Sequence, residues 1–144
     1  KKINLKDLAG KPVVAAMVYT SCAHTCSMMT SRVKDIKSSL EASKQSDVTY
    51  ALISFDSKGD TAEALNNYKS SRKLDSNWVL LRANESHIRQ LAGMLGVNYK
   101  EVAKGEYSHS NIISLLDKNG VLLTQINGLN KPTTQLTQQL VSLL

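Results

Sequence analysis

The stretch VVAAMVYTSCAHTCSMM, residues 13–29, runs from an apolar segment directly into two cysteines, Cys22 and Cys26. The apolar part, 13–20, has the length and the β-branched content of a strand that is buried on both faces. Apolar residues then recur at three- and four-residue steps, which predicts a helix over 25–43. The sequence therefore places a pair of thiols where a buried strand ends and a helix begins.

Short apolar segments alternate with amphipathic segments over the rest of the chain, a pattern typical of an α/β fold. Beyond the first strand, strands are predicted at 47–54, 77–83, 110–116 and 121–126, and helices at 61–72, 84–96 and from 131 to the C-terminus. The sequence contains no repeat and no linker, so we expect a single domain over residues 1–144. The predicted architecture is a central mixed sheet flanked by helices, closed by a C-terminal hairpin and helix.

Local signals mark the ends of several of these elements. Asp60 or Thr61 is placed to cap the helix that follows, and Asn84 is placed to cap the next helix, which Gly96 ends. The Asn-Gly pair at 119–120 predicts a tight turn between the last two strands, because this pair accepts a positive φ.

Composition excludes several classes of protein. The 144 residues include 18 basic and 12 acidic side chains, and the resulting charge of +6 is spread along the chain, which favours a solvated surface over nucleic-acid binding. The longest apolar run, 13–19, is far shorter than the ~20 residues that span a bilayer. Because the chain begins at Lys1, we expect a trimmed form from which any signal peptide or membrane anchor has been removed.

The spacing of the two cysteines leaves three kinds of site open. Cysteines four residues apart on a regular helix have Cα atoms about 6 Å apart, at the long end of what a disulfide tolerates, although a loop would let them close. A structural disulfide would enclose only a short loop and would stabilise the fold little. A redox-active dithiol and a soft cation held between two thiolates are the other two possibilities.

The element order, with a dithiol at the end of the first long strand, is that of thioredoxin-like folds. Three motifs add a more specific resemblance to the Sco/SenC family, thioredoxin-fold copper proteins associated with the assembly of cytochrome c oxidase. The motifs are VYTSCAHTC at 18–26, ALISFDSKGDTAEALNNY at 51–68 and GEYSHSNIISLLDKNG at 105–120. They occur in the family's order and spacing, and the resemblance covers nearly the whole chain.

The resemblance implies that copper is bound by Cys22, Cys26 and His109. Two thiolates and an imidazole form a soft, three-coordinate set that suits Cu(I), can also hold Cu(II), and leaves a weak or open position for transfer. A tetrahedral structural zinc site would require a fourth protein ligand, and none is obvious. Asp56 matches a further acid of the family, and it is expected to lie just outside the ligands.

Other residues near these motifs have less specific roles. We expect Tyr19 and Tyr107 to wall the site without binding metal, and Ser108 stands where the family usually has an acidic residue that can orient the imidazole. Met29 falls on the apolar stripe of its helix, so it is interpreted as a core residue. His24 and His87 are interpreted as surface residues, with metal binding as an alternative for His24, and Met28 stays open as a minor candidate for a thioether ligand.

The family resemblance implies a metallochaperone that delivers copper to the oxidase subunit housing the binuclear copper centre, rather than an enzyme. An alternative is a thiol-disulfide oxidoreductase that keeps the cysteines of an oxidase subunit or of another copper chaperone reduced. A third possibility is a copper or redox sensor whose output is a change of partner. Of the first two functions, both use Cys22 and Cys26, and only the metallochaperone requires His109. We expect a periplasmic protein, or one anchored in the membrane and facing the periplasm, with the mitochondrial intermembrane space as the eukaryotic equivalent.

Overall fold

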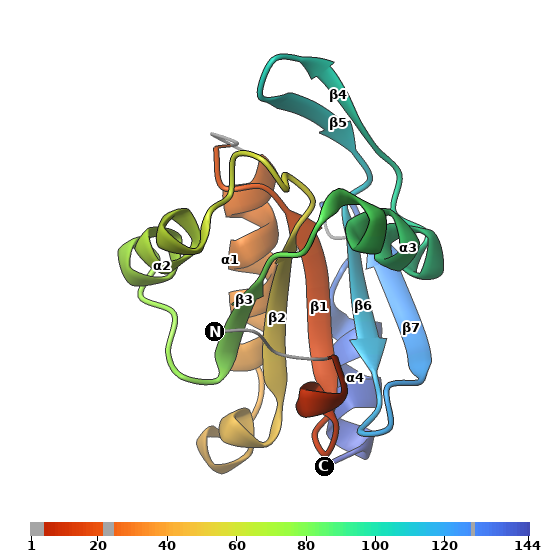
Figure 1. Ribbon diagram of the computed structural model, residues 1–144. Helices are drawn as coiled ribbons and strands as arrows, with labels where there is room; N and C mark the ends of the chain where they lie inside the picture. Colours follow the sequence, from red (N-terminus) through yellow and green to blue (C-terminus); the bar gives the residue numbers. More distant parts are fainter. Residues whose placement is uncertain (1–4, 22–24, 128) are drawn as a thin grey trace.

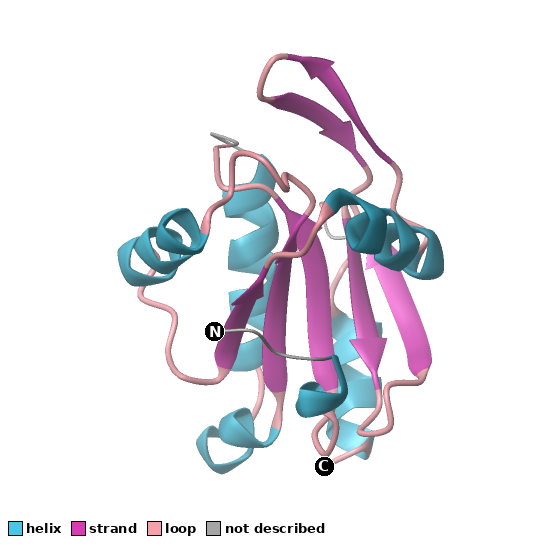
Figure 2. Ribbon diagram, viewed as in Figure 1, coloured by secondary structure: helices cyan, strands magenta, loops and turns pink. Residues whose placement is uncertain are grey.

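A five-stranded mixed sheet forms the centre of the computed structural model, which describes residues 5–21, 25–127 and 129–144. The strands, in their order across the sheet, are β3 (Trp78–Leu81), β2 (Thr49–Ser54), β1 (Val13–Val18), β6 (Ile112–Leu116) and β7 (Leu122–Asn127). The first three run parallel, and β6 and β7 run antiparallel to their neighbours. Figures 1 and 2 show this sheet face on.

Helices flank the sheet, as the sequence predicts for a thioredoxin-like fold. They are α1 (Thr25–Ser38), α2 (Ala62–Ser71), α3 (Glu85–Leu95) and α4 (Thr134–Ser142), and two short 3-10 helices cover Leu5–Leu8 and Ala42–Asp47. In Figure 1, α1 and α4 lie behind the sheet, α3 lies in front of it and α2 flanks the β3 edge. No helix in the described part of the chain is both long and apolar enough to cross a membrane.

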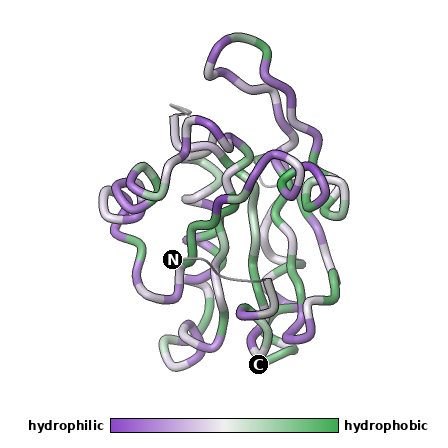
Figure 3. The backbone as a smooth tube through the Cα atoms, in the orientation of Figure 1, coloured by the Kyte–Doolittle hydropathy of each residue, from purple (hydrophilic) through white to green (hydrophobic). Residues whose placement is uncertain are grey.

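The core is built around β1, the central strand. All six of its residues are buried, which explains why its sequence is continuously apolar instead of alternating. Hydrophobic residues accordingly concentrate in the central strands (Figure 3). Met29, Val33 and Ile36 of α1 are completely buried against this sheet, so the interpretation of Met29 as a core residue is confirmed.

The predicted helix over 25–43 ends earlier than expected, at Ser38. The Ser39 hydroxyl donates to the backbone oxygen of Ile36 at 2.6 Å, a local contact that competes with continued helix, and a 3-10 helix then occupies 42–47. The predicted caps of α3 are confirmed. The Asn84 side chain accepts from the backbone N–H of His87, and Gly96 adopts the left-handed conformation.

The sequence predicts no helix or strand between 96 and 110, but the structure has a second sheet of two strands there. It is a hairpin of β4 (Tyr99–Ala103) and β5 (Glu106–His109), which stands apart at the top of Figure 1. Four of the five residues of β4 are exposed, so the apolar alternation that reveals a half-buried strand is absent. The strand predicted at 110–116 begins only at Ile112.

Candidate functional site

The candidate site lies at the end of the sheet where β1 and β2 reach their carboxyl ends and α1 begins, at the top of Figure 1. Cys26 is the second residue of α1. Cys22 and His24 lie outside the described residues. The segment that contains them is therefore bracketed between Thr20–Ser21, just after β1, and the first turn of α1.

His109 is the last residue of β5, and its ring lies against the end of β1. The ring centroids of His109 and Tyr19, the residue after β1, are 5.8 Å apart with an interplanar angle of 89°. The centroid of Phe55, the residue after β2, is 5.0 Å from that of His109. Residues far apart in the sequence are thus brought together. His109 lies beside Tyr19, which precedes Cys22 by three positions.

The Nδ1 atom of His109 is 3.0 Å from the backbone oxygen of Ser110. A proton on Nδ1 that donates to this carbonyl fixes the tautomer in which Nε2 carries the ring's lone pair. A metal bound by that tautomer would be bound through Nε2, and the hydrogen bond at Nδ1 would orient the ring.

Five rings form an aromatic cluster around this end of the sheet, and the cluster comprises Tyr19, Phe55, Tyr99, Tyr107 and His109. Tyr99 stacks on Phe55, with centroids 5.2 Å apart, and is the cross-strand partner of His109. The Tyr107 hydroxyl donates to Asp56 Oδ1 at 3.1 Å, and its backbone N–H donates to the Tyr19 hydroxyl at 3.4 Å. Burial, together with the hydrogen bond to Asp56, raises the pKa of Tyr107 to about 12.

Asp56 is buried just beyond the end of β2, with 4% of its surface exposed. Its carboxylate accepts from the Gly59 backbone N–H at 2.9 Å and from Tyr107, and its own backbone N–H donates to Ser54 Oγ. Asp56 therefore supports the hairpin that carries His109, and its contact with that hairpin runs through Tyr107.

A second carboxylate, Asp60, supports the segment before Cys22. It is 1% exposed, and it accepts from the backbone N–H of Thr20 at 3.0 Å, from the Thr20 hydroxyl, and from Ser54 Oγ at 2.6 Å. The sequence suggested Asp60 or Thr61 as the cap of α2, and Thr61 fills that role by accepting from the Ala64 N–H. The role of Asp60 could not be predicted, because in the sequence an acidic residue just before a helix has the same appearance whether it caps the helix or forms buried hydrogen bonds elsewhere.

Arg72 brings a positive charge to the first turn of α1. Its guanidinium donates to Ser27 Oγ and lies over the Tyr68 ring, 5.1 Å from the centroid, while the Tyr68 hydroxyl is 2.8 Å from Thr30 Oγ1. A cation at a helix N-terminus favours the thiolate form of a cysteine in that turn. Sequence reasoning missed Arg72, because it lies 45 residues from Ser27 and belongs to no motif.

The other residues singled out in the sequence lie farther from the chemistry. His87 is exposed, as expected, and Met28 is exposed too. Ser108 pairs with Lys100 across the hairpin and faces solvent, whereas its neighbours Tyr107 and His109 are turned inward. Position 108 therefore faces away from the imidazole. Among the residues that the structure describes, no three His, Cys, Asp or Glu side chains are grouped as a metal site would require.

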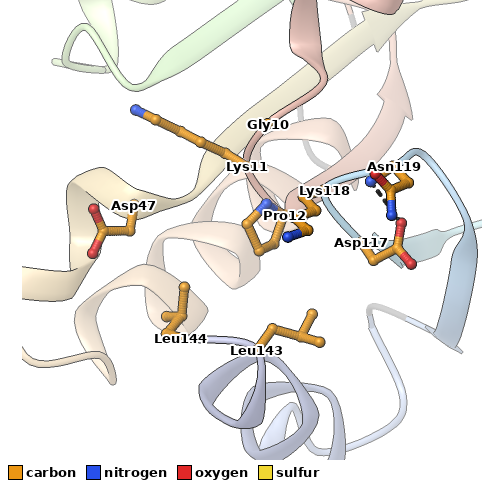
Figure 4. A pocket seen from close by; sticks show the side chains of 9 residues that line it. All are labelled: Gly10, Lys11, Pro12, Asp47, Asp117, Lys118, Asn119, Leu143 and Leu144. Atoms are coloured by element: carbon orange, nitrogen blue, oxygen red, sulfur yellow. Dashed lines mark hydrogen bonds between the residues drawn. The ribbon is translucent and has the colours of Figure 1, made fainter.

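A cavity of about 530 Å³ lies at the opposite end of the sheet (Figure 4). Lys11 and Asp117, two of the charged residues that line it, already have partners. The Lys11 amine donates to the Ser46 carbonyl, and the Asp117 carboxylate accepts from the backbone N–H groups of Asn119 and Val121. These contacts stabilise the turn between β6 and β7 and join the segment before β1 to the 3-10 helix over 42–47.

The family model described as SCO1/SenC matches residues 1–144. The chain belongs to the SCO1/SenC family. In this SCO1/SenC protein, His109 is the last residue of β5, and α1, which contains Cys26, begins at Thr25. No curated protein sequence matches the chain.

Solved structures with the same fold include a SCO1/SenC family lipoprotein from Bacillus anthracis, with 25% identity and a TM-score of 0.86 over 98% of this chain and 86% of that one. Bradyrhizobium japonicum ScoI, solved with copper bound, has 24% identity and a TM-score of 0.75 over 96% of this chain and 88% of the other. BsSco, described as having a disulfide switch and as a member of the Sco family of cytochrome c oxidase assembly proteins, has 24% identity and a TM-score of 0.82 over 99% and 85%.

Proposed function

We propose that this SCO1/SenC protein is a metallochaperone that binds copper through Cys22, Cys26 and His109 and transfers it to an acceptor protein. The observation that carries the proposal is the contact of His109 with Tyr19, because it brings an imidazole to the point where the chain enters the dithiol segment. Copper bound to ScoI, a protein of the same fold, supports the identity of the metal.

The ligand set fits copper on chemical grounds. Thiolates are soft ligands, so the pair favours Cu(I), and the imidazole adds a ligand that also suits Cu(II). The copper is cargo, and a three-ligand site leaves a position through which an acceptor's ligand can approach. Binding requires the reduced dithiol, because a disulfide sulfur has no thiolate charge to offer.

The acceptor that we propose is the copper-bearing subunit of cytochrome c oxidase, or another copper chaperone on the way to it. This assignment rests on family membership and on the description of BsSco as an oxidase assembly protein. It implies a location on the periplasmic side of a membrane, or in the intermembrane space of mitochondria, and the lipoprotein from B. anthracis is consistent with it.

A thiol-disulfide oxidoreductase is the second candidate function. The specific observations in its favour are the disulfide switch described for BsSco and the Arg72 guanidinium held at the first turn of α1, where a positive charge favours a reactive thiolate. This function uses the same two cysteines but has no need of an imidazole.

His109→Ala separates the two functions. The reduced protein is titrated with Cu(II) while the thiolate-to-copper charge-transfer band is recorded, and affinity is measured by competition with a chelator. We expect His109→Ala to weaken copper binding at least ~10-fold, the scale on which even residues outside a ligand set act, and to alter the band, while disulfide exchange is retained.

His87→Ala is the matched control, because His87 is an exposed histidine on α3. It should bind copper as the parent does. Cys22→Ser or Cys26→Ser should abolish both activities, since each activity needs the pair. Parental copper affinity in His109→Ala, with a collapse of the exchange rate, would replace the metallochaperone with an oxidoreductase in which His109 is the base that activates a thiol.

A further inference from the structure

The hairpin that carries His109 is attached to the body of the protein through one of its faces. In the described part of the chain, β4 and β5 pair only with each other and add no strand to the five-stranded sheet. Along β5 the side chains alternate, so that Glu106 and Ser108 are exposed while Tyr107 and His109 are turned inward. We call this hairpin, residues 99–109, the β4–β5 ribbon. The position of His109 over the end of β1 depends on how firmly the inner face of the ribbon is held.

Tyr107 joins the ribbon to both strands beneath it. Its hydroxyl donates to Asp56, which lies two residues beyond the end of β2, and its backbone N–H donates to the hydroxyl of Tyr19, the residue that follows β1. The same residue thus connects β5 with the ends of β2 and β1, two residues before the proposed ligand.

The acceptor of the Tyr107 hydroxyl is itself held in place. Asp56 is almost completely buried, and a second hydrogen bond, from the Gly59 N–H to the same carboxylate oxygen, fixes its orientation. A hydrogen bond to a carboxylate is stronger than one between neutral groups, and it strengthens further where water is excluded. The contact is therefore a firm anchor for an otherwise exposed ribbon.

From this arrangement we infer that Tyr107 is a positioning residue for His109, which holds the β4–β5 ribbon in the orientation that presents the imidazole to copper. The inference rests on the proposed function. Tyr107 does not bind the metal, and it acts on affinity by setting the fraction of molecules whose ribbon is docked. The apparent affinity of a site falls in proportion to that fraction.

The chain offers a closely matched pair of variants. Tyr107→Phe and Tyr99→Phe each remove one hydroxyl from the same aromatic cluster and keep the ring. The Tyr99 hydroxyl is buried and has no hydrogen-bond partner among the described residues, whereas that of Tyr107 is bound to Asp56. Any difference in copper affinity or hydrogen exchange between the two variants is therefore due to the hydrogen bond of Tyr107, because both variants lose one oxygen atom from the cluster.

The test combines copper affinity with amide hydrogen exchange of residues 99–109 in the metal-free protein. We expect Tyr107→Phe to weaken copper binding about 10-fold and to speed exchange in the ribbon by a similar factor, with the exchange of β1 and β2 unchanged. Tyr99→Phe should match the parent in both measurements. The charge-transfer band at saturating copper should be that of the parent in both variants, because the ligands are intact.

Parental exchange and affinity in Tyr107→Phe would overturn the inference, as would equal effects of the two variants. A parent protein that bound no copper would refute the proposed function instead. Hydrogen exchange needs no metal, so it would still decide whether Tyr107 holds the ribbon.

Discussion

Asp60 Oδ2 lies 3.0 Å from the backbone nitrogen of Thr20, so a buried carboxylate of the β2–α2 connection holds the chain two residues before Cys22. The same carboxylate binds the hydroxyls of Thr20 and Ser54. The start of the dithiol segment is thus fixed by a side chain from another part of the sequence.

Asp60→Asn should destabilise the protein by about 2–4 kcal/mol, because an amide cannot accept from all these donors and leaves at least one buried polar group unsatisfied. Urea unfolding measures this loss. Asp35→Asn, on the exposed face of α1, is the control and should change the unfolding free energy by less than ~0.5 kcal/mol. Equal stabilities of the two variants would show that Asp60 is not a brace.

Gly59→Ala should also be destabilising, by about 1–3 kcal/mol. A Cβ atom at this position would lie 2.2 Å from Asp56 Oδ2, so the carboxylate that anchors Tyr107 would have to move. Gly93 lies inside α3, and no described residue outside its own helix turn comes within 4 Å of the place that its Cβ would take. Gly93→Ala should therefore stabilise the protein by about 0.5–1 kcal/mol. Thermal unfolding of both variants checks the opposite signs, and a neutral Gly59→Ala would contradict the close approach.

Alkaline pH should loosen the contact between Tyr107 and Asp56. The pKa of Tyr107 is raised by burial and by Asp56 to about 12, above the value of ~10 expected in the unfolded chain. A raised pKa means that the stabilisation is complete below pH ~10 and is lost as the pH rises towards 12. The unfolding free energies of the parent and of Tyr107→Phe should therefore converge over this range. A constant difference between them would be inconsistent with titration of Tyr107.

Ser108→Asp tests whether an acid before the histidine acts on the imidazole. Position 108 faces solvent and pairs with Lys100, so the new carboxylate should form a cross-strand ion pair worth about 0.2–1 kcal/mol to the ribbon. Copper affinity should stay within about 5-fold of the parent, the largest change that such a stabilisation of the docked ribbon permits. A gain of 10-fold or more, measured by chelator competition, would mean that the carboxylate reaches the histidine.

The central sheet was predictable because strands buried on both faces are continuously apolar in sequence. The run at 13–20 has the length and the β-branched content of a strand covered on both faces, and β1 occupies Val13–Val18 of it. The caps of α3 were equally predictable, because Asn84 and Gly96 interact only with the ends of the helix that they flank. These features depend on residues that are neighbours in the chain.

The ribbon and the braces were not predictable for the opposite reason. The β4 strand shows no apolar alternation because four of its residues face water. Asp60 and Arg72 act on Thr20 and Ser27, which are 40 and 45 residues away, and no spacing rule connects such pairs. His109 and Asp56 were found through family motifs, whereas the link between their elements, Tyr107, required the folded structure.

The separation of the β4–β5 ribbon from the main sheet has a practical consequence for work on the protein. The ribbon contributes no strand to the five-stranded sheet, so its detachment would leave nearly all of the secondary structure in place. Protein with a loose ribbon would give almost the same far-UV circular dichroism as fully competent protein, because that spectrum reports helices and strands. Purification and storage are therefore better monitored by metal loading, since a sample can be well folded by the usual criteria and still be poor at holding its cargo.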